Sequence, residues 1–415
     1  MKYSNINSYL HFLYRIIVFV SFLLLAKVLL LDFYPDFSIY YEASKSFTHG
    51  MNPYLGGKQF FTAFVYPPFV LVFFLPFVTL PFFIAEKVWI SLSLILLLAS
   101  VGIMYRMNNI KLLSSEAMII SSLVFIFFPA KFTLGMGQSN MVILFLVTLF
   151  LYFFQKNKQI PAAIALGFSI AIKLFPVLFL AYLFLQKQWK IFFITSGTVI
   201  GLFGIAYLIN PEINRYFYQH ILPTLFSSEK TDYYNQALSG FLLRGFHDKT
   251  IITILKIGIS SFILISTFVV IVKKLPFHRT PSNSPLSGGG QTNFIFSLLI
   301  TVSVLINSFS WQHHFVWLLI PFLITYSSLR TGPQTGEAIS HYVMLLISFM
   351  LVAGNLKNPS HVPILLQSHV FYGGLLLWIL QIRLLSFAKT SSDMVEYICV
   401  RLQVVKERAN NVLEL

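Results

Sequence analysis

Long, uninterrupted apolar runs separated by short polar segments dominate this sequence. A helix needs about 20 mostly apolar residues to cross a bilayer, and such runs recur throughout the chain. We place them at 12–31, 65–82, 84–105, 117–134, 139–154, 160–185, 191–209, 252–272, 293–309, 315–329, 341–354 and 363–385. The runs are continuous rather than alternating, and they are too long for the strands of an outer-membrane barrel. The sequence therefore predicts an all-α polytopic membrane protein, a helical bundle of about 12 transmembrane helices.

Composition and charge fit this class. Of the 415 residues, 57% are hydrophobic and 10% are charged, whereas soluble domains are about a quarter charged. The net charge of +15 would suit nucleic acid, but the Lys and Arg residues stand singly or in pairs between apolar runs. We therefore expect membrane lipids and no nucleic acid as partners. The single cysteine, Cys399, excludes an internal disulfide framework and a Cys-based metal site.

Basic residues predict the orientation, because Lys and Arg accumulate in cytoplasmic loops. The first run has no small-residue cleavage site, so we interpret it as an uncleaved span. With the N-terminus inside and about 12 spans, the basic turn at Lys187 and Lys190, the Pro/Ser/Gly-rich linker 273–292 and the tail 388–415 fall in the cytoplasm.

The same assignment places two long polar segments outside, a first outer loop at 32–64 and a large outer loop at 210–251. Residues 1–387 then form one transmembrane domain in the plasma membrane, with its site facing the periplasmic or extracellular side. The topology of 106–190 stays open. Basic residues near 106–111 and 156–158 would lie outside, unless 117–185 contains broken or re-entrant helices, for which irregular backbone beside a cavity would account.

The first outer loop concentrates acidic residues next to aromatic ones. Asp32, Asp36 and Glu42 are three of only 14 acidic residues in the chain, and Tyr40 follows Asp36 by four positions. A carboxylate held beside apolar aromatics is a suitable general base, because burial raises its pKa. We assign that role to Asp36, whereas Asp32 fits a solvated loop and Glu42 fits a helix cap.

Two further motifs lie between or within apolar runs. The segment GMGQSN holds Gln138 and Asn140, which suit either a simple helix break or a cavity lining that binds a hydroxyl-rich ligand. Lys173 lies in the middle of a run and is followed by Pro176. It suits either a side chain that extends to the membrane surface or one that holds an anion in a cavity.

The remaining candidates are in the second half of the chain. Asn235, Gln236 and Arg244 belong to the large outer loop, where arginine would bind phosphate bidentately or simply be solvated. His313 and His314 follow Trp311, with no carboxylate ligands nearby in sequence, so contact with phosphate or a sugar hydroxyl is preferred to a metal. No Walker, HExxH, GxSxG or Rossmann motif occurs, and we expect neither a metal nor a cofactor.

Taken in order, these blocks resemble glycosyltransferase family 87. They are DFSIYYEASKSFTHGMNPYL, FVYPPF, GMGQSN, GFSIAIKLFPVLFL, NQALSGFLLR and SWQHHFVWLLIP, which run from about residue 30 to 320. The resemblance implies a GT-C-type helical bundle with a catalytic first outer loop. It also implies a hexosyltransferase that moves a hexose, expected to be mannose, from a polyprenyl-phosphate sugar to a lipid-linked or cell-envelope glycan in glycolipid biosynthesis.

The resemblance also implies residue roles. Asp36 is the catalytic base beside Tyr40, and Lys173, Asn235, Gln236, Arg244, His313 and His314 match further family elements. With Tyr66, Gln138 and Asn140, these residues other than Asp36 are the expected substrate-binding residues. One departure affects local backbone shape, because the family's Ser-Pro-x-Ser-Trp element reads NSFSW here. One carboxylate with several cationic or hydrogen-bonding groups fits a single-displacement, inverting transfer.

Three other classes of protein share some of these features. A transporter or lipid flippase would also carry broken helices and buried charge, but inverted repeats are not evident. Another GT-C activity, such as protein O-glycosylation, would call for a peptide-binding domain, for which 210–251 is short. A non-enzymatic scaffold does not account for the polar residues grouped on one predicted face.

Overall fold

The computed structural model describes residues 2–55, 63–227, 231–273, 290–308, 310–331, 336–356 and 359–387. Across these residues the regular structure is helical, and the sole extended pairing is one antiparallel bridge between Asn235 and Trp311. The all-α prediction is therefore confirmed. Most of the predicted linker 273–292 and all of the predicted tail 388–415 lie outside the described residues.

The first half of the chain forms ten α-helices in the described ranges. They are α1 (Lys2–Ala26), α2 (Pro35–Thr48), α3 (Phe69–Val78), α4 (Phe82–Met107), α5 (Ser115–Ile126), α6 (Phe128–Met136), α7 (Asn140–Gln155), α8 (Gln159–Ile172), α9 (Leu178–Leu185) and α10 (Trp189–Ile209). Short 3-10 turns extend α1 at η1 (Lys27–Leu30) and join α8 to α9 at η3 (Phe175–Val177).

Shorter helices open the second half, and longer ones follow. They are α11 (Pro211–Tyr216), α12 (Leu222–Ser227), α13 (Leu238–Gly245), α14 (Lys249–Lys273), α15 (Gly290–Ile306), α16 (Leu319–Thr331), α17 (Gly336–Ala353) and α18 (His369–Phe387). The 3-10 segment η5 (Gln312–Leu318) leads into α16.

Helix lengths bear on the predicted number of spans. Within the described ranges, five helices are long and apolar enough to cross a membrane, or six if the bent pair α5 and α6 counts as one. Helices such as α3, α7 and α8 are apolar but shorter. The chain is therefore a multi-pass membrane protein, but the count of about 12 full-length spans is not confirmed.

The helix breaks expected between 117 and 185 are present. The pair α5 and α6 bends by 50°, where Pro129 has no N–H to continue the helix. Helix α8 ends at Ile172, the next residue, Lys173, has an extended backbone, and Pro176 follows inside η3. The second break places Lys173 outside the helical backbone, between α8 and η3.

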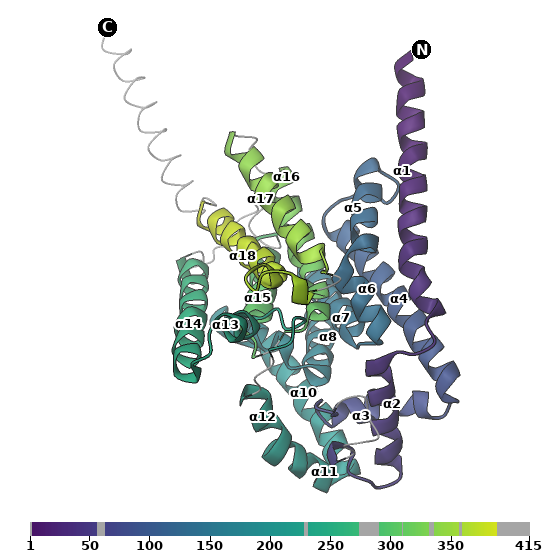
Figure 1. Ribbon diagram of the computed structural model, residues 1–415, viewed down its shortest axis with the longest axis vertical. Helices are drawn as coiled ribbons and strands as arrows, with labels where there is room; N and C mark the ends of the chain where they lie inside the picture. Colours follow the sequence, from purple (N-terminus) through teal and green to yellow (C-terminus); the bar gives the residue numbers. More distant parts are fainter. Residues whose placement is uncertain are drawn as a thin grey trace, which may run out of the picture.

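The two segments predicted to lie outside meet at one end of the molecule. Figure 1 shows α2 and α3 beside α11 and α12 at the lower end, while α1, α5, α16 and α17 extend toward the upper end. Ring contacts join the segments, since the Tyr54 ring lies 6.1 Å from that of Tyr216 and 5.8 Å from that of Phe217. The first loop and the α11–α12 part of the large loop therefore belong to one structural layer.

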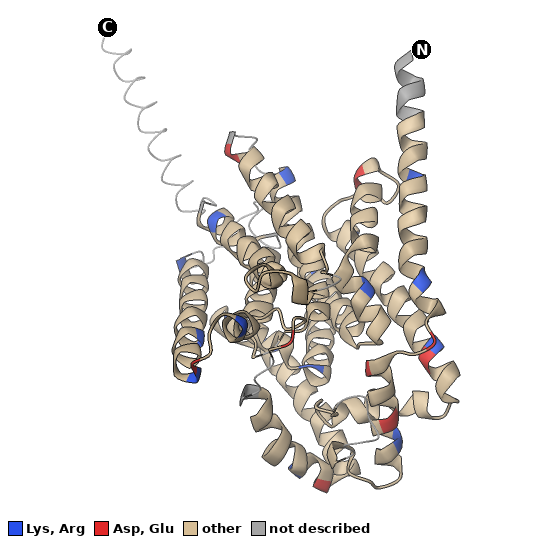
Figure 2. Cartoon of the chain, viewed as in Figure 1, with Lys and Arg blue, Asp and Glu red and all other residues tan. Residues whose placement is uncertain are grey.

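The outer helices present apolar surface. Ile200 and Leu208 on α10 are 69% and 82% exposed, and α1 and α14 likewise leave most of their apolar residues uncovered. Figure 2 shows that most of the helix surface carries charge of neither sign. Such faces suit contact with lipid, whereas a soluble protein would cover them.

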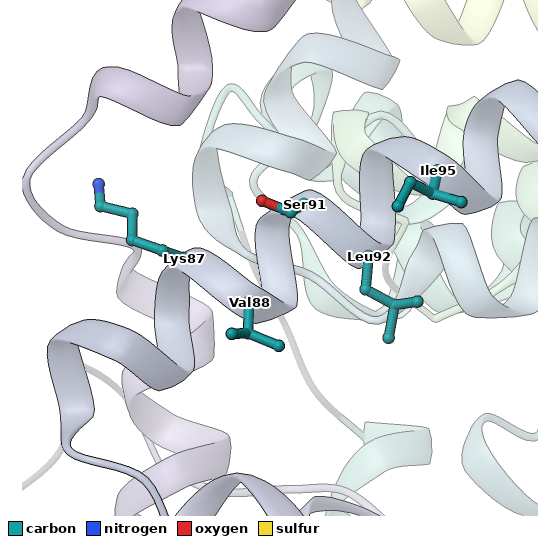
Figure 3. A pocket seen from close by; sticks show the side chains of 5 residues that line it. All are labelled: Lys87, Val88, Ser91, Leu92 and Ile95. Atoms are coloured by element: carbon teal, nitrogen blue, oxygen red, sulfur yellow. The ribbon is translucent and has the colours of Figure 1, made fainter.

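Lys87 on α4 forms hydrogen bonds with the chain segment between α1 and α2. Its Nζ donates to the carbonyl oxygens of Leu29, at 3.2 Å, and Leu31, and it lies 5.0 Å from the centre of the Tyr34 ring. Figure 3 shows Lys87 with Val88, Ser91, Leu92 and Ile95 lining a shallow hollow on α4. These bonds fix the chain just before α2, the helix that carries Asp36.

Candidate active site

Asp36 belongs to the acidic half of the site, by which we mean Asp36 with Tyr40 and Gln138. Pro35 is the first residue of α2 and Asp36 stands in its first turn, where a carboxylate is favoured by the helix dipole. The side chain is buried, and burial raises the pKa of Asp36 from 3.8 to about 6, although a hydrogen bond from Gln138 and the charge of Lys173 oppose this rise. A carboxylate with this pKa is suited to accept a proton near neutral pH.

Gln138 links Asp36 to two tyrosines. Its Nε2 donates to Asp36 Oδ2 at 2.6 Å, and its Oε1 accepts from Tyr40 Oη at 2.7 Å. The Tyr66 hydroxyl lies 3.1 Å from Nε2 and 3.3 Å from Oε1 of the same amide. Asp36, Tyr40 and Tyr66 therefore share one amide that comes from the turn after α6.

The turn that presents Gln138 depends on a glycine. Gly137 ends α6 with φ +70°, and a Cβ there would lie 2.7 Å from Phe37 Cβ, a distance that real Cβ atoms essentially never show. Trp89 Nε1 donates to the Gly137 carbonyl at 2.8 Å, which holds the turn against α4. Close contact with α2 thus requires glycine at this position.

Lys173 is the central residue of the basic half of the site, by which we mean Lys173 with Asn140, His313 and His314. Its Nζ donates to Asn140 Oδ1 at 2.9 Å and lies 2.8 Å from His314 Nε2. It also lies 5.3 Å from the ring centre of Trp317 and 5.6 Å from that of Tyr66. Tyr66 therefore contacts both halves, with its hydroxyl at Gln138 and its ring face at Lys173.

The two histidines are placed by η5. Thr133 Oγ1 and Asn140 Nδ2 donate to the His313 carbonyl at 2.9 and 3.3 Å, and the His314 ring stacks on Trp317 at 5.2 Å. When Lys173 is protonated, His314 Nε2 must accept, so Nδ1 carries the proton.

Three ring nitrogens of the two histidines form no hydrogen bond with the described residues. His314 Nδ1 and both ring nitrogens of His313 are buried without a hydrogen-bond partner in the part of the chain that the structure describes. Buried nitrogens of this kind are available to a ligand.

Asn235, Gln236 and Arg244 form a second cluster rather than joining the first. Arg244 Nη1 donates to the Asn235 carbonyl at 2.8 Å, and its Nη2 donates to Ser368 Oγ at 2.7 Å. Gln236 Nε2 donates to the carbonyls of Tyr233 and Gln367 at 2.6 and 2.8 Å. The amide and guanidinium donors of this cluster are thus largely engaged by the protein itself.

The second cluster is joined to the first through the backbone. Gln236 N donates to the Ser310 carbonyl and Gln312 N donates to the Tyr234 carbonyl, both at 2.8 Å. Asn235 Oδ1 accepts from Ser310 N at 3.2 Å. These bonds fix the chain directly before His313, so this cluster positions the histidine segment.

Eight of the predicted site residues therefore come together in one buried network, namely Asp36, Tyr40, Tyr66, Gln138, Asn140, Lys173, His313 and His314. Trp317 lies inside the quoted block SWQHHFVWLLIP, where no role was expected of it, and sequence reasoning missed Trp89, which lies in no quoted block. It also missed Ser368, which no motif marks. In the described ranges no group of three or more His, Cys, Asp and Glu side chains is arranged to hold a metal.

The fold and site define a class, a polytopic helical membrane protein whose buried carboxylate and buried cation lie in one polar network. The profile of glycosyltransferase family 87 matches residues 64–284, more than half of the chain. The chain belongs to this family, and it is an integral-membrane glycosyltransferase. Because the match excludes Asp36, His313 and His314, the roles of these residues depend on geometry.

Curated relatives lie at low identity. The polyprenol-phosphate-mannose-dependent alpha-(1-2)-phosphatidylinositol mannoside mannosyltransferase of Mycobacterium tuberculosis is 24% identical over 70% of this chain and 69% of its own. The corresponding pentamannoside mannosyltransferase of Mycolicibacterium smegmatis is 23% identical over 62% of this chain and 59% of its own. The crystal structure of ArnT from Cupriavidus metallidurans bound to undecaprenyl phosphate is 12% identical, with a TM-score of 0.42 over 89% of this chain and 76% of that one.

Proposed function

We propose that this protein transfers a mannosyl unit from a polyprenyl-phosphate sugar to a lipid-linked or cell-envelope glycan on the outer face of the plasma membrane. The names of the mycobacterial relatives support the donor and the class of acceptor. The observation that carries the proposal is that Asp36 and Lys173 lie in one buried network, joined through Gln138 and Tyr66.

Asp36 is the general base. Its carboxylate takes the proton from an acceptor hydroxyl while that oxygen bonds to the anomeric carbon of the donor sugar. The bond from that carbon to the phosphate oxygen breaks in the same step, and both of its electrons leave with the lipid phosphate. One displacement inverts the anomeric configuration, unlike the two-step route of retaining glycosidases.

The basic half receives the leaving group. A lipid phosphate leaves already charged, so it needs cationic or hydrogen-bond stabilisation rather than a second acid. Lys173 supplies the charge, and the Nδ1–H of His314 and the one N–H of neutral His313, which have no partner among the described residues, donate to phosphate oxygens. Asn140 holds the Lys173 ammonium in place.

Asn235, Gln236 and Arg244 enter the proposal in a different way. Their donors bind backbone carbonyls and Ser368. They therefore act by positioning the segment before His313 and do not bind the phosphate. The polyprenyl tail would lie between apolar helices, whose exposed faces suit contact with lipid. The outward orientation agrees with the predicted loops 32–64 and 210–251, of which α2, α11 and α12 lie at one end of the molecule (Figure 1).

The proposal is tested with purified protein in vesicles. Radiolabelled polyprenyl-phosphate mannose and polyprenyl-phosphate glucose are supplied separately, with lipid extract from a strain lacking this protein as acceptor. We expect mannose in a lipid-soluble product, with the anomeric configuration opposite to that of the donor by NMR. Transfer from a nucleotide sugar alone, or retention of configuration, would contradict the proposal. A protease-sensitive labelled product would instead indicate a protein acceptor.

A further inference from the structure

We infer that Gln138 is a positioning residue for Asp36 and Tyr40 rather than a contact for the substrate. This inference rests on the proposed role of Asp36 as the base. It gives Gln138 a different task from the substrate binding that the sequence suggested.

The first argument is that protein groups use the whole amide. Nε2 donates to Asp36 Oδ2 at 2.6 Å and faces the Tyr66 hydroxyl at 3.1 Å, while Oε1 accepts from Tyr40 at 2.7 Å. The side chain is only 4% exposed. Since a primary amide has two N–H donors, no donor is left for a sugar hydroxyl or a phosphate.

The second argument concerns the orientation of the amide. The reverse orientation would place Oε1 against the Asp36 carboxylate, so that two acceptors would face each other. It would also turn the NH₂ group toward the Tyr40 hydroxyl, which now donates to Oε1. The network therefore admits one orientation, in which the amide always offers a donor to Asp36.

The third argument is the support behind the amide. Asp36 and Tyr40 are four residues apart on α2, so they lie on one face of the helix. Gln138 bonds to both and therefore clamps α2 to the turn after α6. The turn itself is fixed by Gly137 and by the hydrogen bond from Trp89 Nε1 to the Gly137 carbonyl. This support makes the clamp rigid.

The clamp has a chemical consequence for the base. Gln138 holds Oδ2 of Asp36, and Oδ1 has no hydrogen-bond partner among the described residues. Oδ1 is therefore the oxygen that accepts the proton from the acceptor hydroxyl. Gln138 sets the direction in which Oδ1 points and keeps the carboxyl ionised at neutral pH, because its N–H stabilises the charged form.

The test compares Gln138→Met, which keeps the length but removes the amide, with Gln138→Glu, which sets a second carboxyl against Asp36. The pKa of Asp36 is read from its carboxyl band in infrared difference spectra, with Asp36→Asn as the blank. We expect Gln138→Met to raise it by about one to two pH units, and Gln138→Glu to raise it as well. For Gln138→Met, kcat at pH 7 should fall about 10- to 100-fold, while KM for polyprenyl-phosphate mannose changes by less than about twofold.

Gln381→Met is the matched control, because Gln381 is a buried amide bonded to Thr301 and Ser297 on α15. It should leave the Asp36 band unchanged. Should Gln138→Met not fold, Gln138→Asn keeps the amide but withdraws it by one methylene, and the same upward shift is expected.

Two results would overturn the inference. One is an unchanged Asp36 band in folded Gln138 variants, and the other is a raised KM with kcat and pH dependence intact, as expected of a substrate contact. Full activity of Asp36→Asn would instead refute the proposed base. The infrared measurement would still decide whether Gln138 and Asp36 are paired.

Discussion

At the scale of single residues, Asp32 and Asp36 show how position separates identical side chains. Asp32 is exposed in the connection before α2, whereas Asp36 is buried in the first turn of the helix. The sequence predicted this ranking from the aromatic residues after Asp36 and from the family resemblance. It could not predict the partner of Asp36, because Gln138 lies 102 residues away in the chain and no local pattern encodes that contact.

The pH dependence of kcat/KM should report the ionisation of Asp36. Burial raises its pKa from 3.8 to about 6, so the carboxyl is protonated and inactive as a base below that value. We expect kcat/KM to fall about tenfold per pH unit as the pH decreases below about 6. A profile measured from pH 4.5 to 8 checks this. An acid limb near pH 4 would show that the base is a solvent-exposed carboxylate.

Lys173→Met should impair the departure of the lipid phosphate. Removing a cation aimed at developing charge lowers kcat by about 10²- to 10³-fold, as for other electrostatic stabilisers of a transition state. Undecaprenyl phosphate, used as a binding probe, should bind at least about tenfold more weakly. The matched control is Lys190→Met, an exposed lysine at the start of α10. Unchanged probe affinity in Lys173→Met would remove Lys173 from the phosphate site.

At the scale of elements, the site is built from helix ends and breaks. Glycine and proline revealed the breaks near 137 and 173 in advance, since both residues interrupt helices for known reasons. Prolines also shortened a helix that the hydropathy had predicted to be longer. The run 65–82 forms only Phe69–Val78, between Pro67 and Pro68 on one side and Pro81 on the other.

Gly137→Ala should destabilise the turn that carries Gln138. Its φ of +70° strains any other residue, and the new Cβ would meet Phe37 Cβ at 2.7 Å. We expect a loss of about 1–3 kcal/mol in the free energy of unfolding, together with lower activity. Gly102→Ala on α4 is the control, because nothing lies within 4 Å of a Cβ there and alanine favours a helix. Equal stability of the two variants in detergent would contradict this account of the turn.

At the scale of the whole molecule, one network gathers residues from five distant parts of the chain. The sequence predicted the helical class, the breaks and all eight members of that network. It also predicted Asn235, Gln236 and Arg244 as substrate contacts, whereas their donors bind backbone carbonyls and Ser368. Residue type indicates what a side chain can bind, but packing of the large loop decides whether it is already occupied.

Orientation is tested by cysteine labelling, with the single Cys399 replaced by serine. Lys45 is exposed on α2 and Lys190 is exposed at the start of α10. If the first loop faces outward, a membrane-impermeant maleimide should label Lys45→Cys in intact cells and Lys190→Cys only after lysis. The reverse pattern would place the site on the cytoplasmic side.

The most direct test of the account is mannosyl transfer by Asp36→Asn in reconstituted vesicles. Asparagine has nearly the same shape but cannot accept the proton, so kcat should fall by about 10²- to 10⁴-fold. Binding of undecaprenyl phosphate should persist, because the basic half is untouched. Asp32→Asn, the exposed carboxylate four residues earlier, should transfer at the wild-type rate. Undiminished transfer by folded Asp36→Asn would contradict the assignment of Asp36 as the catalytic base.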